Sequence, residues 1–163
     1  MKVAPSRLQD RPQVDAFLRS HNALHVARQA ELVDCSQHPA LLAWSGDDLV
    51  GVATYLISER GCELLTLHAR SRFCGTGSAL LAALEEVAER QACARLWVVT
   101  TNDNCDALRF YQRRGFRLAR LRPGAVTASR QTLKPEIPAL GLFGIPIRDE
   151  IELEMVLTDA HVD

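Results

Sequence analysis

The run from Arg72 to Ser78 constrains this chain most, because two glycines stand where a β-like stretch gives way to a helix-patterned one. Gly75 and Gly77 allow a tight turn and bring main-chain N–H groups close to a ligand. The following helix would add unpaired first-turn donors and the positive end of its dipole. Such a turn can serve chain reversal alone, or it can hold an anion such as a phosphate. Ser78 follows the last glycine in place of a Walker-loop Lys, and Leu80 replaces the third small residue of a dinucleotide fingerprint.

Composition predicts one globular domain over residues 1–163, since 47% of the residues are hydrophobic and 24% are charged. A net charge of −1 favours neither a nucleic-acid surface nor a polybasic membrane patch. The five cysteines form an odd set without a CxxC pair, which argues against a disulfide framework and a zinc site. No apolar run approaches a signal peptide or a membrane span. We therefore expect a cytoplasmic protein with no metal, nucleic-acid or membrane partner.

The first two-fifths of the chain carry signals of very different strength. Asp10 to about Asn22 predicts a helix, with Asp10 as a possible N-cap and an apolar face formed by Val14, Phe17 and Leu18. Residues 23–39 predict only irregular structure or a short second helix. Next come three apolar runs separated by turn clusters, which predict three successive antiparallel strands over residues 41–44, 49–57 and 62–69.

Helices and strands alternate after the glycine turn. Apolar residues recur at helical spacing to about Gln91, and a short buried strand follows over residues 96–100. Asn104 can cap a helix through Arg114, which Gly115 would end in the left-handed conformation. A strand follows over residues 116–121. The long connection over residues 123–147 holds a possible helical turn at 125–133, and connections of this length are usually functional or disordered.

The last strand shows the clearest alternation. Ile151, Leu153, Met155 and Leu157 share one face, and Glu150, Glu152 and Glu154 share the other. We therefore expect one face to be buried and the glutamate face to be wet or to line a cleft.

The order of these elements and two motifs together resemble the GNAT superfamily of acyl-CoA-dependent N-acetyltransferases. Arg72-Phe73-Cys74-Gly75-Thr76-Gly77 is similar to that family's pyrophosphate signature, Gln or Arg, two residues, Gly, one residue, then Gly or Ala. The run from Asn104 to Phe116 is similar to its Asn-x-x-Ala-x-x-Phe-Tyr-x-x-x-Gly-Phe pattern. The resemblance covers residues 41–116 and the final strand by topology. The first forty residues and the 123–147 loop carry no signature.

The resemblance implies an α/β (α+β) fold with a mixed, mostly antiparallel central sheet, helices on both faces, and a splay between the fourth and fifth strands. It also implies acetyl-CoA as the acyl donor, held in the gap between residues 62–69 and 96–101, with direct attack by the acceptor amine. The resemblance also implies three groups of donor-binding residues. Strand residues pair with the pantetheine arm of CoA, the glycine turn and its arginine hold the pyrophosphate, and two residues belong to the helix after Asn104. These residues are Leu67, His68, Ala69, Arg72, Cys74, Gly75, Thr76, Gly77, Ser78, Asn104 and Tyr111.

Tyr111 is the candidate general acid that the resemblance implies, because this position in the family protonates the departing CoA thiolate. Spacing alone supports another interpretation, since Ala107, Leu108 and Tyr111 share a helical face and Tyr111 could be an aromatic core residue. Asn104 likewise can cap its helix, contact the CoA arm, or do both.

Glu63 is the leading candidate for the base that deprotonates the amine. Strand alternation predicts that Glu63 lies on the same face as Leu65, Leu67 and Ala69. Related enzymes often have a glutamate that acts as a base near this position of the strand. The alternative is that Glu63, just after a turn, simply faces water. His68 is a second candidate base or a packed histidine.

The candidate substrate-binding residues are Arg130, Asp149 and Glu150. Surface charge at Arg130 and a solvated strand face at the two acids are the competing interpretations. We expect an N-acetyltransferase acting on a primary amine of a small molecule. Two further functions fit the same motifs: acetylation of a protein N-terminus or lysine, and a non-catalytic acyl-CoA sensor. Family members are often dimers, so a homodimer is possible.

Overall fold

The computed structural model describes residues 1–72 and 74–157, which form two compact parts. The first part comprises residues 1–25, 34–96 and 157, and the second comprises residues 26–33 and 97–156. Both combine helices with mostly antiparallel strands, so the predicted mixed α/β class is confirmed. No helix of the described residues has the length and apolar character needed to cross a membrane.

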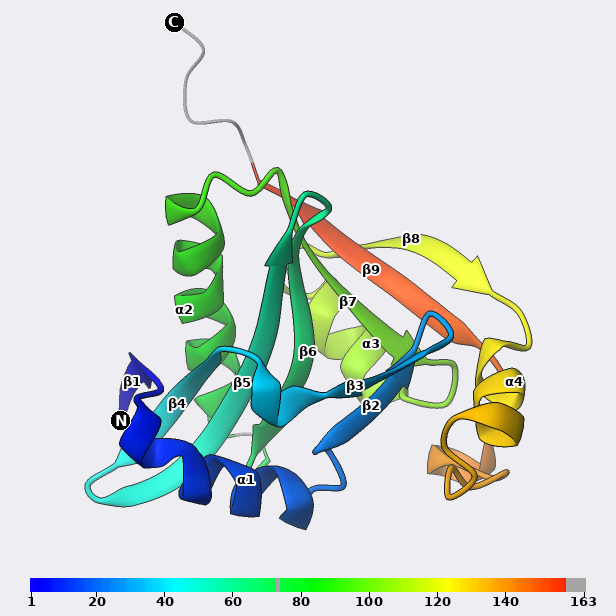
Figure 1. Cartoon of the computed structure of the whole chain (residues 1–163). Helices are drawn as coiled ribbons and strands as arrows, with labels where there is room; N and C mark the ends of the chain where they lie inside the picture. Colours follow the sequence, from blue (N-terminus) through cyan, green and yellow to red (C-terminus); the bar gives the residue numbers. More distant parts are fainter. Residues whose placement is uncertain (73, 158–163) are drawn as a thin grey trace, which may run out of the picture. The chain divides into compact units, whose positions relative to one another are not determined.

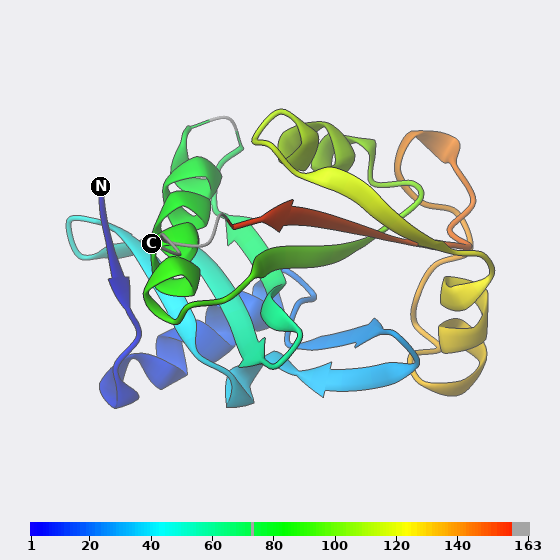
Figure 2. The same ribbon diagram turned by 90° about the horizontal axis from the view of Figure 1, so that it is seen from above.

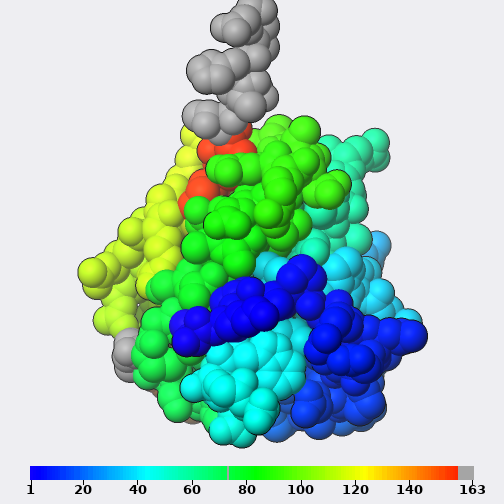
Figure 3. Space-filling model, turned by 90° about the vertical axis from the view of Figure 1, so that its left-hand side faces the viewer, coloured from blue at the N-terminus to red at the C-terminus, as the bar shows by residue number. Residues whose placement is uncertain are grey.

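Four antiparallel strands form the sheet of the first part. Their order is β1 (Lys2–Pro5), β4 (Ala40–Ser45), β5 (Asp48–Ser58) and β6 (Gly61–Ala69). The three predicted antiparallel strands are therefore confirmed. β1 was not predicted, because its four residues are too short a run to show a period. Figure 3 shows β1 at the surface, between α2 (Thr76–Arg90) and the turn that joins β4 to β5.

Two helices cover opposite faces of this sheet (Figures 1 and 2). α1 (Arg11–Ser20) follows a short 3₁₀ helix (Leu8–Asp10) and buries the predicted face of Val14, Phe17 and Leu18. α2 covers the other face with its own buried leucines, Leu80, Leu81 and Leu84. Asp10 occupies the N-cap position of α1, but its carboxylate accepts a hydrogen bond from the Arg7 main chain at 2.8 Å and does not cap the helix.

Residues 23–39 contain a β-hairpin, so the prediction of irregular structure or a helix is wrong. β2 (His25–Arg28) pairs with β3 (Glu31–Asp34), and a 3₁₀ helix (Cys35–Gln37) follows. The hairpin turn places Gln29 and Ala30 at φ of +52° and +61°, the left-handed pair of a type I′ turn. Such turns usually carry Asn-Gly or Asp-Gly. Here the Gln29 main-chain N–H donates to the Glu150 carboxylate at 3.1 Å, a distant contact that no local pattern reveals.

The second part contains most of β7 (Arg95–Thr101), the helices α3 (Cys105–Gln112) and α4 (Ala125–Thr132), and the antiparallel pair β8 (Arg117–Arg122) and β9 (Glu150–Val156). Figure 2 shows β8 beside β9. A 3₁₀ helix (Leu142–Gly144) lies in the long connection. Gly115 follows α3 at φ +93°, and α4 occupies the expected helical segment, so both predictions are confirmed.

The glutamate face of β9 was expected to be wet or to line a cleft, and its burial shows that the wet alternative is wrong. Glu150 is 1% exposed and Glu152 is 4% exposed. Arg122 on the neighbouring strand donates to Glu152 at 2.9 Å and lies 3.9 Å from Glu150. The alternating pattern was right, but it could not show that an arginine of β8 compensates the two buried carboxylates.

Gly51 allows α2 to pack closely on β5. A methyl group at this position would lie 2.5 Å from Cγ2 of Thr76 and 2.9 Å from Cδ1 of Leu80. We predict that Gly51→Ala lowers the free energy of unfolding by about 2–3 kcal/mol, because overpacking displaces the first turns of α2. Gly46→Ala is the control, since that site is open and only its φ of +60° costs about 1 kcal/mol. Urea denaturation measures both, and equal losses would contradict close packing as the cause.

Candidate functional site

The glycine turn leaves the start of α2 open. Gly75 occupies the N-cap position at φ +82°, and because glycine has no side chain it supplies no capping oxygen. An added Cβ at Gly75 would meet no atom of the described residues within 4 Å. The first turn of α2 also carries no acidic residue. The start of this 15-residue helix therefore has no side-chain cap, and the helix dipole favours an anion there.

The predicted residues Cys74 to Ser78 form this turn and the start of α2. Thr76 is 3% exposed, and its hydroxyl lies 3.1 Å from Sγ of Cys74. Hydrogen bonding to Thr76 lowers the pKa of the exposed Cys74 thiol. Arg72 and Ser78 are also described, whereas Phe73 of the motif lies outside the described residues. The Cys74 thiol and the Thr76 hydroxyl thus brace the turn.

A β-bulge at Leu65 determines which way the side chains of β6 face. Tyr55 pairs with Leu64 and Thr54 pairs with Thr66, so the register skips Leu65. Leu67, His68 and Ala69, the predicted arm-binding residues, continue the regular ladder by pairing with Ala53, Val52 and Gly51. The bulge shifts the alternation of side chains by one residue between the two halves of β6.

This shift corrects the predicted parity of Glu63. Directly paired residues of an antiparallel ladder share a face, and the partners of His68, Thr66 and Glu63 are alternate residues of β5: Val52, Thr54 and Leu56. Glu63 therefore faces with Thr66 and His68, and not with Leu67 as predicted. The Thr54 and Thr66 hydroxyls lie 2.6 Å apart on this face, and Glu63 is 3% exposed. Glu63 does not simply face water.

His68 lies at the α1 end of this polar face. Its ring is 5.3 Å from the ring of His21, which stacks on Phe17 at 4.3 Å. Burial lowers the pKa of His68 to about 4, and the neighbouring His21 adds to the effect. His68 is therefore neutral at physiological pH, and both interpretations of this residue, packed histidine and base, remain compatible with its state.

Asn104 and Tyr111 belong to α3 in the second part. The Asn104 side chain accepts a hydrogen bond from the Ala107 main chain at 3.2 Å, which confirms the predicted cap. Tyr111 is 6% exposed and packs between Phe110 and Phe116, with ring centroids 5.2 and 5.3 Å away. Burial raises the pKa of the Tyr111 hydroxyl. The tyrosine is thus a packed aromatic residue that keeps its proton at physiological pH.

The candidate substrate-binding residues of the second part all make contacts within the fold. Arg130 donates to the carbonyl oxygens of Ile137, Pro138 and Ile147 at 2.8–2.9 Å. Asp149 accepts from the Gly124 main chain at 2.8 Å. Burial raises the pKa of Glu150, although its hydrogen bond from Gln29 and the nearby Arg122 oppose that effect. These residues hold the long connection and the β2–β3 hairpin in place, a role that local patterns could not show.

Comparisons with known proteins agree with this geometry. Residues 7–116 match the sequence model of the acetyltransferase (GNAT) family. The chain is 43% identical to the uncharacterized protein YdhI of Bacillus subtilis (strain 168) over 144 residues, which cover 88% of this chain and 89% of that one. The chain therefore belongs to the GNAT acetyltransferase family, and the resemblance is confirmed.

Solved structures show the same fold. An IAA acetyltransferase from Bacillus cereus ATCC 14579 has a TM-score of 0.72 and 22% identity, covering 96% of this chain and 100% of that one. A Bacillus subtilis acetyltransferase in complex with CoA has a TM-score of 0.70 and 18% identity, covering 96% and 99%. The ribosomal-protein-S18-alanine N-acetyltransferase of Escherichia coli has a TM-score of 0.70 and 14% identity, covering 99% and 97%. The names of the first and third of these proteins give different acceptors.

We predict that His68 makes the protein less stable in acid. Because its folded pKa of about 4 lies below the unfolded value of 6.5, the unfolded chain binds more protons between these pH values. The free energy of unfolding should fall as the pH decreases from 6.5 to 4, by on the order of 3 kcal/mol more in the parent than in His68→Gln. Urea denaturation at several pH values measures this difference. His25→Gln removes an exposed histidine as the control, and parallel pH profiles for the parent and His68→Gln would contradict the prediction.

Proposed function

We propose that the protein transfers an acetyl group from acetyl-CoA directly to a primary amine of a small molecule. The open N-terminus of α2 at Gly75 is the observation that carries this proposal, because it offers main-chain donors to a pyrophosphate. Arg72 adds positive charge beside the turn. In this proposal, the donor-binding residues are those of the family pattern: Leu67, His68, Ala69, Arg72, Cys74, Gly75, Thr76, Gly77, Ser78, Asn104 and Tyr111.

The proposed reaction needs no protein nucleophile. The amine nitrogen attacks the thioester carbon, a C–N bond forms, and the carbonyl oxygen becomes an oxyanion. The main-chain amide at the Leu65 bulge is our candidate donor to this oxyanion, since the β5–β6 register skips that residue. The C–S bond then breaks, the amine proton goes to a base, and the CoA thiolate receives a proton.

Glu63 is the proposed base, acting directly or through a water molecule. It shares its face of β6 with Thr66 and His68, and its side chain is buried. A base that is only 3% exposed favours a slender amine, which supports a small acceptor over a broad protein surface. Tyr111 is the proposed acid for the thiolate, because its hydroxyl remains protonated.

Acetylation of a protein N-terminus is the second candidate function. The observation that favours it is the structural similarity to a ribosomal-protein-S18-alanine N-acetyltransferase. Arg130, Asp149 and Glu150 would act in either case by shaping the segments around them, and we propose no direct contact of Arg130 with substrate, since three carbonyl oxygens already occupy its guanidinium.

A screen for CoA release tests the proposed function and separates the two acceptor classes. With acetyl-CoA as donor, we expect at least one small primary amine to be turned over with a higher kcat/KM than peptides with an N-terminal alanine. Tyr111→Phe should lower kcat on that amine by about a hundredfold, because it removes the proton donor. Tyr55→Phe, which alters the other tyrosine of the chain, is the control. Turnover of peptides alone, or full activity of Tyr111→Phe, would contradict the corresponding assignment.

The phosphate turn can be tested by binding alone. We predict that Gly75→Asp raises the Kd for acetyl-CoA at least tenfold, because it places a negative charge at the start of α2. Asp is also a good N-cap, so the helix should remain folded. Gly75→Asn has the same shape without the charge and is the matched control. Isothermal titration calorimetry measures both, and equal affinities of the two variants would show that no anion binds there.

A further inference from the structure

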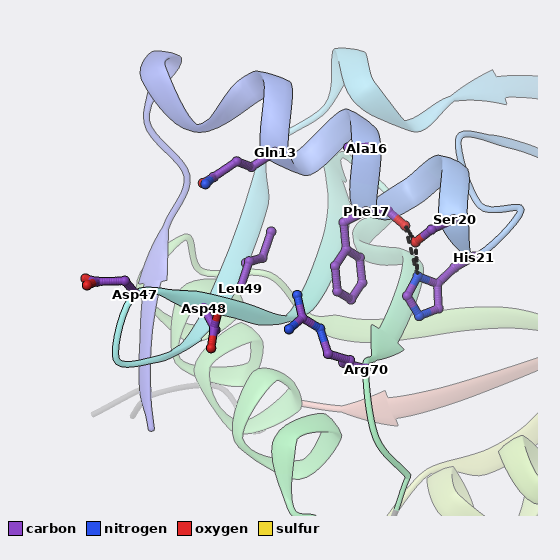
Figure 4. A pocket seen from close by; sticks show the side chains of 9 residues that line it. All are labelled: Gln13, Ala16, Phe17, Ser20, His21, Asp47, Asp48, Leu49 and Arg70. Carbon is purple, nitrogen blue, oxygen red and sulfur yellow. Dashed lines mark hydrogen bonds between the residues drawn. The ribbon is translucent and has the colours of Figure 1, made fainter.

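A cavity of about 400 Å³ lies between α1 and the start of β5, within the first part of the chain. Figure 4 shows its lining: residues of α1 and its C-cap, the β4–β5 turn, the start of β5 and the residue after β6. A volume of this size is in the range of small-molecule sites. The lining residues are Gln13, Ala16, Phe17, Ser20, His21, Asp47, Asp48, Leu49 and Arg70.

The apolar part of the cavity lining is held in place. The Phe17 ring and Leu49 lie opposite each other across the cavity, and both are less than 10% exposed. His21 stacks on Phe17, and its Nδ1 lies 2.9 Å from the Phe17 carbonyl oxygen and 3.0 Å from the Ser20 hydroxyl. These contacts fix the aromatic wall before any ligand arrives, so little side-chain entropy is lost on binding.

Two opposite charges, Arg70 and Asp48, line the same cavity. In the view of Figure 4 the Arg70 guanidinium points toward the space between Leu49 and Phe17, and Asp48 lines the same cavity. Within residues 1–72 and 74–157, neither side chain forms a hydrogen bond or an ion pair. The Arg70 main chain is fixed by its hydrogen bond to the Val50 carbonyl at 2.8 Å. The Asp47 side chain also belongs to the lining but points away from the other groups.

This arrangement selects a ligand that carries both charges. A ligand with only a carboxylate would be attracted by Arg70 but repelled by Asp48. A ligand with only an ammonium group would be attracted by Asp48 but repelled by Arg70. A phosphate ester, with its greater negative charge, would be repelled more strongly by Asp47 and Asp48. A compact zwitterion satisfies Arg70 and Asp48 together, and an apolar side chain would lie between Phe17 and Leu49.

We infer that this cavity binds a small zwitterion of the amino-acid type, with its carboxylate on Arg70, its ammonium group on Asp48 and an apolar side chain against Phe17. The inference goes beyond the proposed acetyl transfer. Glu63 lies near the start of β6 and Arg70 directly follows its end, so seven residues of extended chain separate them by roughly 20 Å. A free amino acid cannot span that length, so this ligand is distinct from an amine placed at Glu63.

Calorimetry without acetyl-CoA tests the inference separately from catalysis. The probe is L-phenylalanine, compared with 2-phenylethylamine, which lacks the carboxylate, and 3-phenylpropanoate, which lacks the amine. We expect saturable binding of L-phenylalanine and at least tenfold weaker binding of each analogue. The His21 ring signal in NMR spectra should shift during the same titration, since His21 adjoins the ligand. No binding of L-phenylalanine, or affinities of the three probes within twofold, would overturn the inference.

Three variants locate the site. Arg70→Gln and Asp48→Asn should each weaken L-phenylalanine binding at least tenfold, whereas Asp47→Asn, the matched control, should change it less than twofold. All three positions are exposed, and an unchanged thermal melting temperature shows that the fold is retained. Unchanged affinity in Arg70→Gln would overturn the assignment. Acetyl-CoA turnover is not used as a readout, so failure of the proposed enzyme activity and failure of this inference remain distinguishable.

Discussion

The ladder between β5 and β6 extends along the whole of β6 and skips one residue, Leu65. Both the donor-binding and the base assignments depend on this pairing. The half of the ladder after the bulge contains Leu67 to Ala69, which lead to the glycine turn. The half before the bulge contains Glu63. Because side chains alternate along a strand, one inserted residue exchanges the two faces of one half. Without the bulge, Glu63 would face with Leu67 toward α2, and the polar face with Thr66 and His68 would lose its carboxylate.

Features set by neighbours in sequence could be predicted well. The cap at Asn104, the left-handed Gly115, the apolar face of α1 and the three antiparallel strands each follow from residues within one or two turns. The glycine turn was found for the same reason, since Gly75 itself supplies the positive φ.

Features set by distant contacts could not be predicted. The β2–β3 hairpin turns at Gln29 and Ala30, residues that rarely adopt positive φ, and the Gln29 main chain is held by Glu150 from 121 residues away. The bulge at Leu65 leaves no local signature either, because the hydrophobic pattern of β6 reads the same with or without it. The burial of Glu152 likewise depends on Arg122, which its own strand does not reveal.

The buried state of Tyr111 bounds how much this residue can contribute as an acid. Desolvation is the larger cause of its raised pKa, and Arg114 opposes it. A thiol such as that of cysteine has a pKa near 8.5, so complete transfer of a proton from the phenol to a thiolate is uphill. A hydrogen bond to the developing thiolate is favourable, however, and bonds to charged groups are worth about 1.5–3 kcal/mol. That range corresponds to between ten- and two-hundredfold in rate, so sharing of the proton suffices for the proposed role of Tyr111.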